Sequence, residues 1–100
     1  MESFPKKLIT IITEAVIEKE LLSVLEQLGA SGFTITDARG KGHRGMRSAG
    51  WEHGANIRVE IICDDKLASA IALRLKSDFY NDYAMVLFMS DVAVLRPDKF

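Results

Sequence analysis

The chain has very little cysteine and proline, with one cysteine, Cys63, and two prolines among 100 residues. A single cysteine excludes the intramolecular disulfides that support many small secreted domains. No charged start followed by an apolar run marks a signal peptide, and no apolar run is long enough to form a membrane-spanning helix. We therefore expect one cytoplasmic domain that covers residues 1–100.

An excess of charge of one sign is also lacking, because 13 basic and 14 acidic residues give a net charge of -1. Such a chain has no overall field with which to hold nucleic acid or an anionic membrane, so any anion site must be local. The hydrophobic fraction of 48% is typical of a globular protein. A domain this short exposes much of its surface, so we expect another chain to cover part of it.

The apolar pattern predicts two similar halves. Short β-branched runs indicate strands, and apolar residues at intervals of three and four indicate amphipathic helices. The strands are expected at residues 8–13, 33–36, 57–61 and 83–89, and the helices at 15–29, ending at a glycine cap, and from Asp64–Asp65 to Phe79. This order predicts an α+β, ferredoxin-like βαββαβ sandwich with both helices on one face of an antiparallel sheet.

The last expected strand, YAMVLFM, is apolar on both faces. One face carries Tyr83, Met85, Leu87 and Met89, and the other carries Ala84, Val86 and Phe88. Helices on one side of the sheet can cover only one of these faces. We therefore expect the open face to meet other subunits.

A glycine-rich basic segment, RGKGHRGMRSAG, lies in the long connection expected at about residues 39–55. Glycines allow backbone N–H groups to approach a phosphate closely, Arg44 and Arg47 offer planar donor groups, and Lys41 offers a point charge. The spacing matches neither a P-loop nor a dinucleotide-binding fingerprint. The segment is therefore either a local anion site or a solvated loop with scattered charges.

Other candidate sites have less support. His43, His53 and Cys63 match no standard metal-ligand spacing, and adjacent Asp64 and Asp65 are typical of a helix start. Trp51 either anchors a partner or folds back onto its own loop. Neither a nucleophilic triad nor a positioned general base is recognisable, and the strand NIRVEII lacks the aromatic residues of an RNA-binding sheet.

The whole chain resembles the PII signalling superfamily. The resemblance rests on LITIITE, GFTITDARGKGHRGMRSAG, ANIRVEI and FYNDYA. Members form trimers, bind adenine nucleotides in clefts between subunits, and contact effectors with a T-loop between strands two and three. The pattern GKGxRxxRSxG followed by NDYA is closer to the SbtB branch, which regulates the cyanobacterial sodium-dependent bicarbonate transporter SbtA.

The resemblance implies a nucleotide site shared by two subunits. It places around the nucleotide Thr34, Gly40, Lys41, Gly42 and His43, with Arg44 and Arg47 on the phosphate and Ile62 at the adenine. The neighbouring subunit would contribute Asn81, Tyr83, Ala84 and Met85. The transporter would contact the T-loop tip, at Met46, Trp51, Glu52 and His53.

The implied protein is a non-enzymatic homotrimer that responds to cAMP, AMP, ADP and ATP, with or without a divalent cation beside ATP. It would control SbtA in the carbon-concentrating mechanism, peripheral to the inner membrane through the transporter, without nucleic acid or direct lipid binding. The resemblance also implies that Arg44 replaces a glutamine that binds metal and 2-oxoglutarate in classical PII proteins, which argues against sensing of that metabolite. The alternatives are a CutA-like metal-handling trimer and a slow ATP/ADP diphosphohydrolase.

Overall fold

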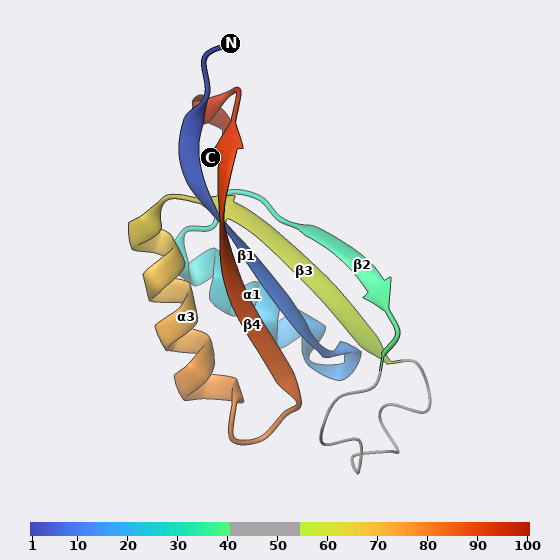
Figure 1. Cartoon of the computed structure of the whole chain (residues 1–100). Helices are drawn as coiled ribbons and strands as arrows, with labels where there is room; N and C mark the ends of the chain where they lie inside the picture. Colours follow the sequence, from blue (N-terminus) through green and yellow to red (C-terminus); the bar gives the residue numbers. More distant parts are fainter. Residues whose placement is uncertain (41–54) are drawn as a thin grey trace.

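The computed structural model describes residues 1–40 and 55–100, in which a four-stranded antiparallel sheet carries two α-helices on one face (Figure 1). The strands are β1 (Phe4–Glu14), β2 (Thr34–Ala38), β3 (Asn56–Cys63) and β4 (Met85–Val94), in the order β2-β3-β1-β4. The helices are α1 (Glu18–Leu28), preceded by the 3-10 turn η1 (Ala15–Ile17), and α3 (Asp65–Phe79), and the turn η2 (Pro97–Lys99) follows β4. The predicted ferredoxin-like fold is confirmed.

The core lies between the sheet and the helices. Ile9 of β1 pairs with Ile61 of β3, and the next inward pair is Ile11 with Val59, so alternate residues of both strands face the helices. The helices contribute the buried residues Leu21, Leu25, Ile71 and Leu75. Each fully buried Leu or Ile side chain stabilises the fold by about 1.5–3 kcal/mol relative to an exposed one.

Both helix ends that the sequence predicts are present. Gly29 takes a left-handed conformation with φ of 95°, and its N–H donates to the carbonyls of Leu25 and Glu26 at the end of α1. The Asp64 carboxylate accepts a 2.8 Å hydrogen bond from the Leu67 amide and caps the start of α3. Asp64 therefore has the structural role expected of a helix-start residue.

The last strand differs from its expected range, since it spans Met85–Val94 instead of 83–89. The amides of Asp82 and Tyr83 donate to the Phe79 carbonyl at 3.1 and 3.0 Å, so this backbone closes the helix turn instead of joining the sheet. At its far end, β4 pairs with β1 as far as Phe4 opposite Val94. The first strand is therefore longer than the expected residues 8–13. The prediction was too short because polar residues interrupt the apolar pattern at the ends of both strands.

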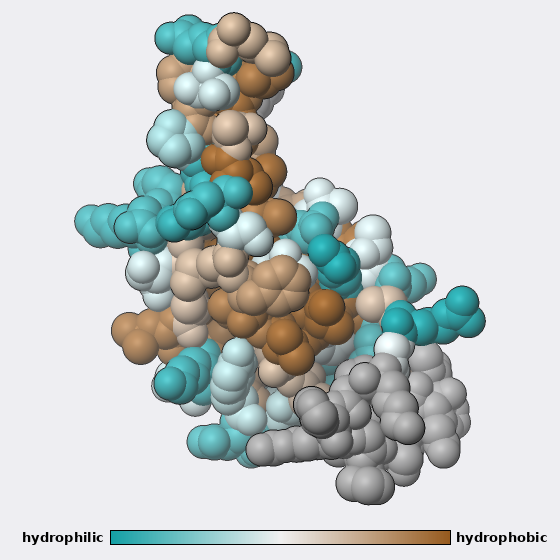
Figure 2. All heavy atoms as spheres, viewed as in Figure 1, coloured by the Kyte–Doolittle hydropathy of each residue, from teal (hydrophilic) through white to brown (hydrophobic). Residues whose placement is uncertain are grey.

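The helix-free face of the sheet is apolar over its middle, as Figure 2 shows in brown. On β4, Leu87 packs against the core while Val86 and Phe88 remain 56% and 43% exposed. Leu8 and Ile12 of β1 are half-buried on the same open face. The prediction that β4 is apolar on both faces is confirmed.

Candidate functional site

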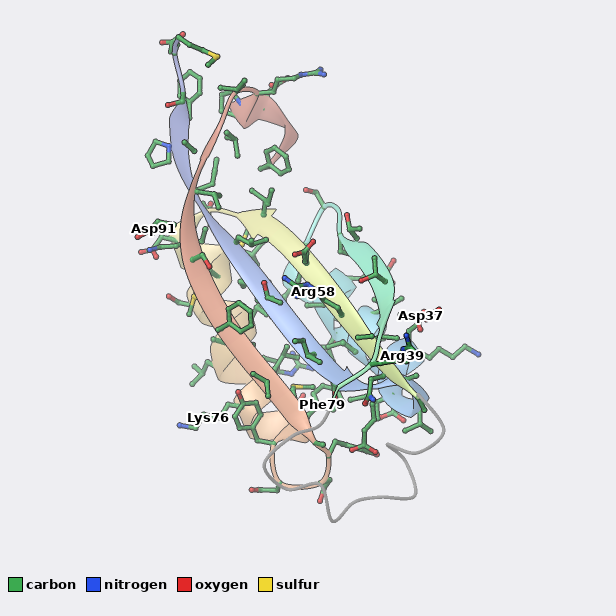
Figure 3. The ribbon with its side chains drawn as sticks, turned by 45° about the vertical axis from the view of Figure 1, so that its right-hand side comes forward. Asp37, Arg39, Arg58, Lys76, Phe79 and Asp91 are labelled. Atoms are coloured by element: carbon green, nitrogen blue, oxygen red, sulfur yellow. The ribbon has the colours of Figure 1, made fainter. Side chains whose placement is uncertain are left out.

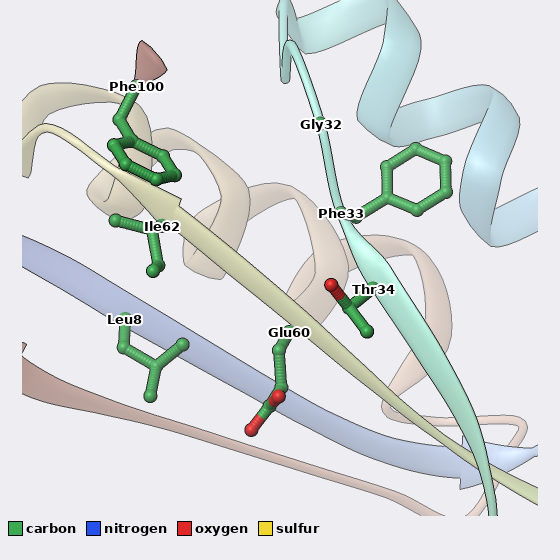
Figure 4. Close-up of a pocket in the computed structure, with 7 residues that line it drawn as sticks. All are labelled: Leu8, Gly32, Phe33, Thr34, Glu60, Ile62 and Phe100. Carbon is green, nitrogen blue, oxygen red and sulfur yellow. The ribbon is translucent and has the colours of Figure 1, made fainter. Parts of the chain in front are cut away.

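An open pocket of about 220 Å³ lies on the helix-free face of the sheet (Figure 4). Leu8 and Ile62 are cross-strand partners, so β1 and β3 together supply an aliphatic floor. Gly32, Phe33 and Thr34 line the side formed by the start of β2, and the ring of Phe100 lies beside Ile62. The pocket therefore joins the sheet, the approach to β2 and the last turn of the chain.

The polar side of the pocket consists of Thr34 and Glu60, which are cross-strand partners on β2 and β3. Arg58, on the same face of β3, donates from Nε and Nη2 to Glu60 Oε2 at 3.3 and 3.2 Å. This contact orients the half-exposed carboxylate. An aliphatic floor beside a hydroxyl and a carboxylate suits a ligand with a flat apolar surface and hydrogen-bonding groups at its edge.

The residues that precede β2 leave the pocket open, because Gly32 has no side chain and the ring of Phe33 does not fill the pocket. The Phe33 ring points away from the pocket, toward α1, whereas the Thr34 hydroxyl points into it (Figure 4). A Cβ atom built on Gly32 would meet no atom within 4 Å. Gly32 therefore borders open space, and the fold of one chain would leave room for a side chain at this position.

The connection between α3 and β4 is held by side chains of β1. Thr13 Oγ1 donates to the Ala84 carbonyl at 2.8 Å, and the Ala84 amide donates to Glu14 Oε2 at 2.6 Å. The Tyr83 ring packs on Phe79 with centroids 6.2 Å apart. Both main-chain polar groups of Ala84 are therefore fixed, and the connection has a defined conformation.

This connection does not reach the pocket of its own chain. Leu8, in the pocket, and Thr13, beside the connection, lie five residues apart on β1, which corresponds to about 17 Å along an extended strand. The strand that leads out of the connection, β4, is also at the sheet edge opposite β2. Asn81, Tyr83, Ala84 and Met85 thus form a second candidate surface, separate from Thr34 and Ile62 within one chain.

The base of the long β2–β3 connection lies at the far end of β2 from the pocket. Asp37 and Arg39 are exposed there (Figure 3), and Gly40 follows. The other predicted loop residues lie outside the described residues: Lys41, Gly42, His43, Arg44, Met46, Arg47, Trp51, Glu52 and His53. Thr34 and Gly40 are therefore joined by one edge strand, which leads from the pocket toward the glycine-rich segment.

Comparison with known proteins gives the family of this chain. The sequence model of the family described as nitrogen regulatory protein P-II matches residues 6–99. The chain belongs to the PII family. Trimers are typical of PII proteins, and these signalling proteins are generally non-enzymatic.

Solved structures of PII-like proteins superpose on nearly the whole chain. A PII-like signalling protein from Thermus thermophilus is 43% identical, with a TM-score of 0.83 over 100% of this chain and 99% of that one. CPII from Thiomonas intermedia K12, bound to ADP, AMP and acetate, is 28% identical, with a TM-score of 0.85 over 100% and 98%. The same protein bound to ADP and bicarbonate gives a TM-score of 0.84 at 28% identity, over 99% and 97% of the two chains.

Within this PII chain, two of the predicted nucleotide residues, Thr34 and Ile62, lie together in the pocket. Sequence reasoning missed the other residues that line it, which are Leu8, Gly32, Phe33, Glu60 and Phe100. The alternation of β1 and β3 carried a signal for Leu8 and Glu60, because it places them on the same face as Ile62 and Thr34. No local pattern marked Phe100, which lies far from the other residues in sequence.

Of the three side chains considered as metal ligands, His43, His53 and Cys63, the structure describes only Cys63. Residues 1–40 and 55–100 contain no group of three or more His, Cys, Asp or Glu side chains arranged to hold a metal, and His43 and His53 lie outside them. Cys63 is buried at the end of β3, and burial raises the pKa of its thiol, with a smaller contribution from the Asp64 charge. Cys63 is therefore a protonated core residue at neutral pH.

The described residues also include no helix long and apolar enough to span a membrane.

Proposed function

We propose that this PII protein is a signalling trimer that binds adenine nucleotides between its subunits. The observation that carries the proposal is the pocket in which Thr34 and Ile62 meet, on a chain of a family whose member CPII binds ADP and AMP. Leu8 and Ile62 offer apolar contact to a base, and Thr34 and Glu60 offer hydrogen bonds to its edge or to the ribose. These residues form the half of the site that one chain supplies.

The proposed second half comes from a neighbouring subunit. The pocket of about 220 Å³ is open and smaller than the roughly 300–1,000 Å³ of pockets that enclose drug-sized ligands. A further wall would complete it. The α3–β4 connection of the next subunit, with Asn81, Tyr83, Ala84 and Met85, is the proposed wall, since its fixed conformation suits a binding surface and it does not reach its own pocket.

The apolar open face of the sheet supports assembly into a homotrimer. An antiparallel sheet with helices on one side normally has a polar second face, whereas here Val86 and Phe88 are exposed beside Leu8 and Ile12. Association of three copies through this face would remove the apolar side chains from water. The same association would bring each pocket close to a neighbouring chain.

The phosphates of the nucleotide would follow the free edge of β2 toward Gly40. With the base near Thr34, this direction leads to the glycine-rich segment, where Lys41, Gly42, His43, Arg44 and Arg47 are proposed to surround the phosphates. Backbone N–H groups next to glycines and arginine side chains both bind phosphate well. The number of phosphates would then determine which of these groups contact the nucleotide. ATP would bind with or without a divalent cation beside its phosphates.

The effector that we propose is the bicarbonate transporter SbtA, which would make this protein an SbtB-type regulator of the carbon-concentrating mechanism. The sequence pattern of the T-loop base and NDYA supports this branch, and the relative CPII binds bicarbonate, the ion that SbtA carries. The loop tip, with Met46, Trp51, Glu52 and His53, is the proposed contact surface. The protein would be at the membrane only through the transporter.

Titration calorimetry of AMP, cAMP, ADP and ATP against the purified chain tests nucleotide binding. Thr34→Ala should weaken AMP binding, whereas Ser69→Ala, at an exposed position of α3 outside the pocket, should not. Arg47→Ala should lower affinity about ten- to hundredfold, because it removes a charge-assisted phosphate contact of about 1.5–3 kcal/mol. No binding of any of the four nucleotides by the wild-type chain would refute the proposal.

Pull-down with membranes that contain SbtA tests the effector separately. Trp51→Ala should reduce capture while AMP affinity stays at the wild-type value, and deletion of residues 46–54 should abolish capture. Full capture by the deletion variant would exclude the T-loop as the contact. A copper titration in parallel discriminates the CutA-like alternative, and product formation from ATP above that of the deletion variant would support the diphosphohydrolase alternative.

A further inference from the structure

Among the described residues that line the pocket, Phe100 is the one whose aromatic ring points into it (Figure 4). Phe100 follows η2, whose turn closes with a 3.2 Å hydrogen bond from the Phe100 amide to the Pro97 carbonyl. Lys6 of β1 donates from Nζ to the Phe100 carbonyl at 3.3 Å. These two contacts bring the end of the described chain back over the sheet and place the ring beside Ile62.

The exposure of this ring is not explained by the fold of one chain. Phe100 is 44% exposed although it lies beside the aliphatic side chains of Leu8 and Ile62. A flat aromatic surface that remains open to water next to an apolar floor gains free energy when another flat apolar group covers it. The opposite side of the pocket carries Thr34 and Glu60, which can hydrogen-bond the edge of such a group.

We propose that the Phe100 ring stacks on the base of the bound nucleotide, an inference that rests on the nucleotide site proposed above. Every nucleobase has an apolar face and a hydrogen-bonding edge, and aromatic side chains bind the face irrespective of phosphate number. Phe100 thus contributes affinity for the base, whereas the glycine-rich segment contributes affinity for the phosphates. A ligand that lacks the base or the phosphates can therefore separate the two contributions.

Leu73 provides a control outside the pocket. It lies on α3, is 73% exposed and does not line the pocket. An effect of a lost exposed apolar side chain on the fold should appear in both variants. An effect of lost stacking should appear only at Phe100.

Calorimetry with AMP and with ribose 5-phosphate tests the inference in four proteins: wild type, Phe100→Ala, Phe100→Tyr and Leu73→Ala. Phe100→Ala should weaken AMP binding about 5- to 150-fold, the range that loss of one base–aromatic stack gives. Phe100→Tyr, which keeps the ring, and Leu73→Ala should bind AMP as the wild type does. Ribose 5-phosphate, which has no base, should bind equally to all four.

A spectroscopic test uses Trp51→Phe combined with Phe100→Trp, so that the introduced indole in the pocket is the only tryptophan of the chain. AMP should quench its fluorescence by stacking, and ribose 5-phosphate should not. If the wild type binds AMP and Phe100→Ala binds it equally, the stacking role is wrong while the nucleotide site stands. An equal loss of AMP and ribose 5-phosphate binding in Phe100→Ala, or an equal loss of AMP binding in Leu73→Ala, also overturns it. Failure of the wild type to bind AMP instead refutes the proposed function itself.

Discussion

The Ala84 amide donates a 2.6 Å hydrogen bond to Glu14 Oε2, so a side chain at the end of β1 holds the residue that precedes β4. Glu14→Ala should destabilise the protein by about 1.5–3 kcal/mol, the usual cost of losing a hydrogen bond to a charged group. Urea unfolding at one fixed protein concentration measures this change. Glu26→Ala, at an exposed position of α1, is the control and should leave stability close to that of the wild type.

Thr10 and Thr13 form a second matched pair, because both are fully buried on β1 but only one has a partner. Thr13 Oγ1 bonds the Ala84 carbonyl, whereas Thr10 Oγ1 has no hydrogen-bond partner among the described residues. Thr13→Val should cost about 1–3 kcal/mol, since it leaves the Ala84 carbonyl unpaired, while Thr10→Val should be neutral or stabilising. The same unfolding experiment measures both.

A loss of stability in Thr10→Val similar to that in Thr13→Val would contradict this prediction. It would mean that the Thr10 hydroxyl finds a partner in the assembled protein.

The Lys7–Asp91 ion pair predicts a stability change at high pH. The hydrogen bond and charge of Asp91 raise the pKa of Lys7 above its ordinary value of 10.5, against a smaller opposing effect of burial. A raised pKa means that the contribution of the pair is complete below the unfolded-state value and is lost as the pH rises through the folded-state value. Stability should therefore fall as the pH rises above about 10.5, the ordinary pKa of lysine.

The variant Asp91→Asn isolates this effect, because it removes the charge that raises the pKa of Lys7. Its stability should decline less than that of the wild type over the same pH range, and added salt should reduce the difference. Urea unfolding at a series of pH values provides the comparison. Parallel curves for the two proteins would show that the pair contributes nothing measurable.

Cys63 should react very slowly with iodoacetamide in the native protein. The thiolate is the reactive species, and burial both raises the pKa of Cys63 and blocks access to its sulfur. Mass spectrometry of the alkylated chain should show fast modification in urea and little without it. Rapid modification of the native protein would show that the end of β3 opens readily.

The strand and helix types followed from the sequence because local patterns encode them. Ile9 and Ile11 alternate with outward residues as a half-buried strand requires, and Gly29 and Asp64 are typical of the helix ends at which they lie. The ends of β1 and β4 could not be predicted from local patterns. Phe4 and Val94 become strand residues only because the two ends pair across the sheet, and the local sequence of one segment does not indicate its partner.

The residues of the candidate site also divide into those that the sequence predicted and those that only the structure brought together. Thr34 and Ile62 came from a resemblance that spans the chain, and the structure places both in one pocket. Glu60 followed from strand alternation only after the register with Thr34 was known. Phe100 lies in the pocket through η2 and the contact with Lys6, which are long-range features that no short motif signals.

The sequence by itself determined the order of strands and helices, the apolar surfaces of β4 and the family pattern, because each depends on residues close together in the chain or on the pattern as a whole. The tertiary structure decided which side chains share the pocket and which lie apart from it. That outcome depends on sheet order and register, which bring Leu8 beside Ile62 and leave Ala84 at a distance. Register is a property of pairs of strands, and a shift of one strand by one residue would move the side chains of that strand to the opposite face of the sheet.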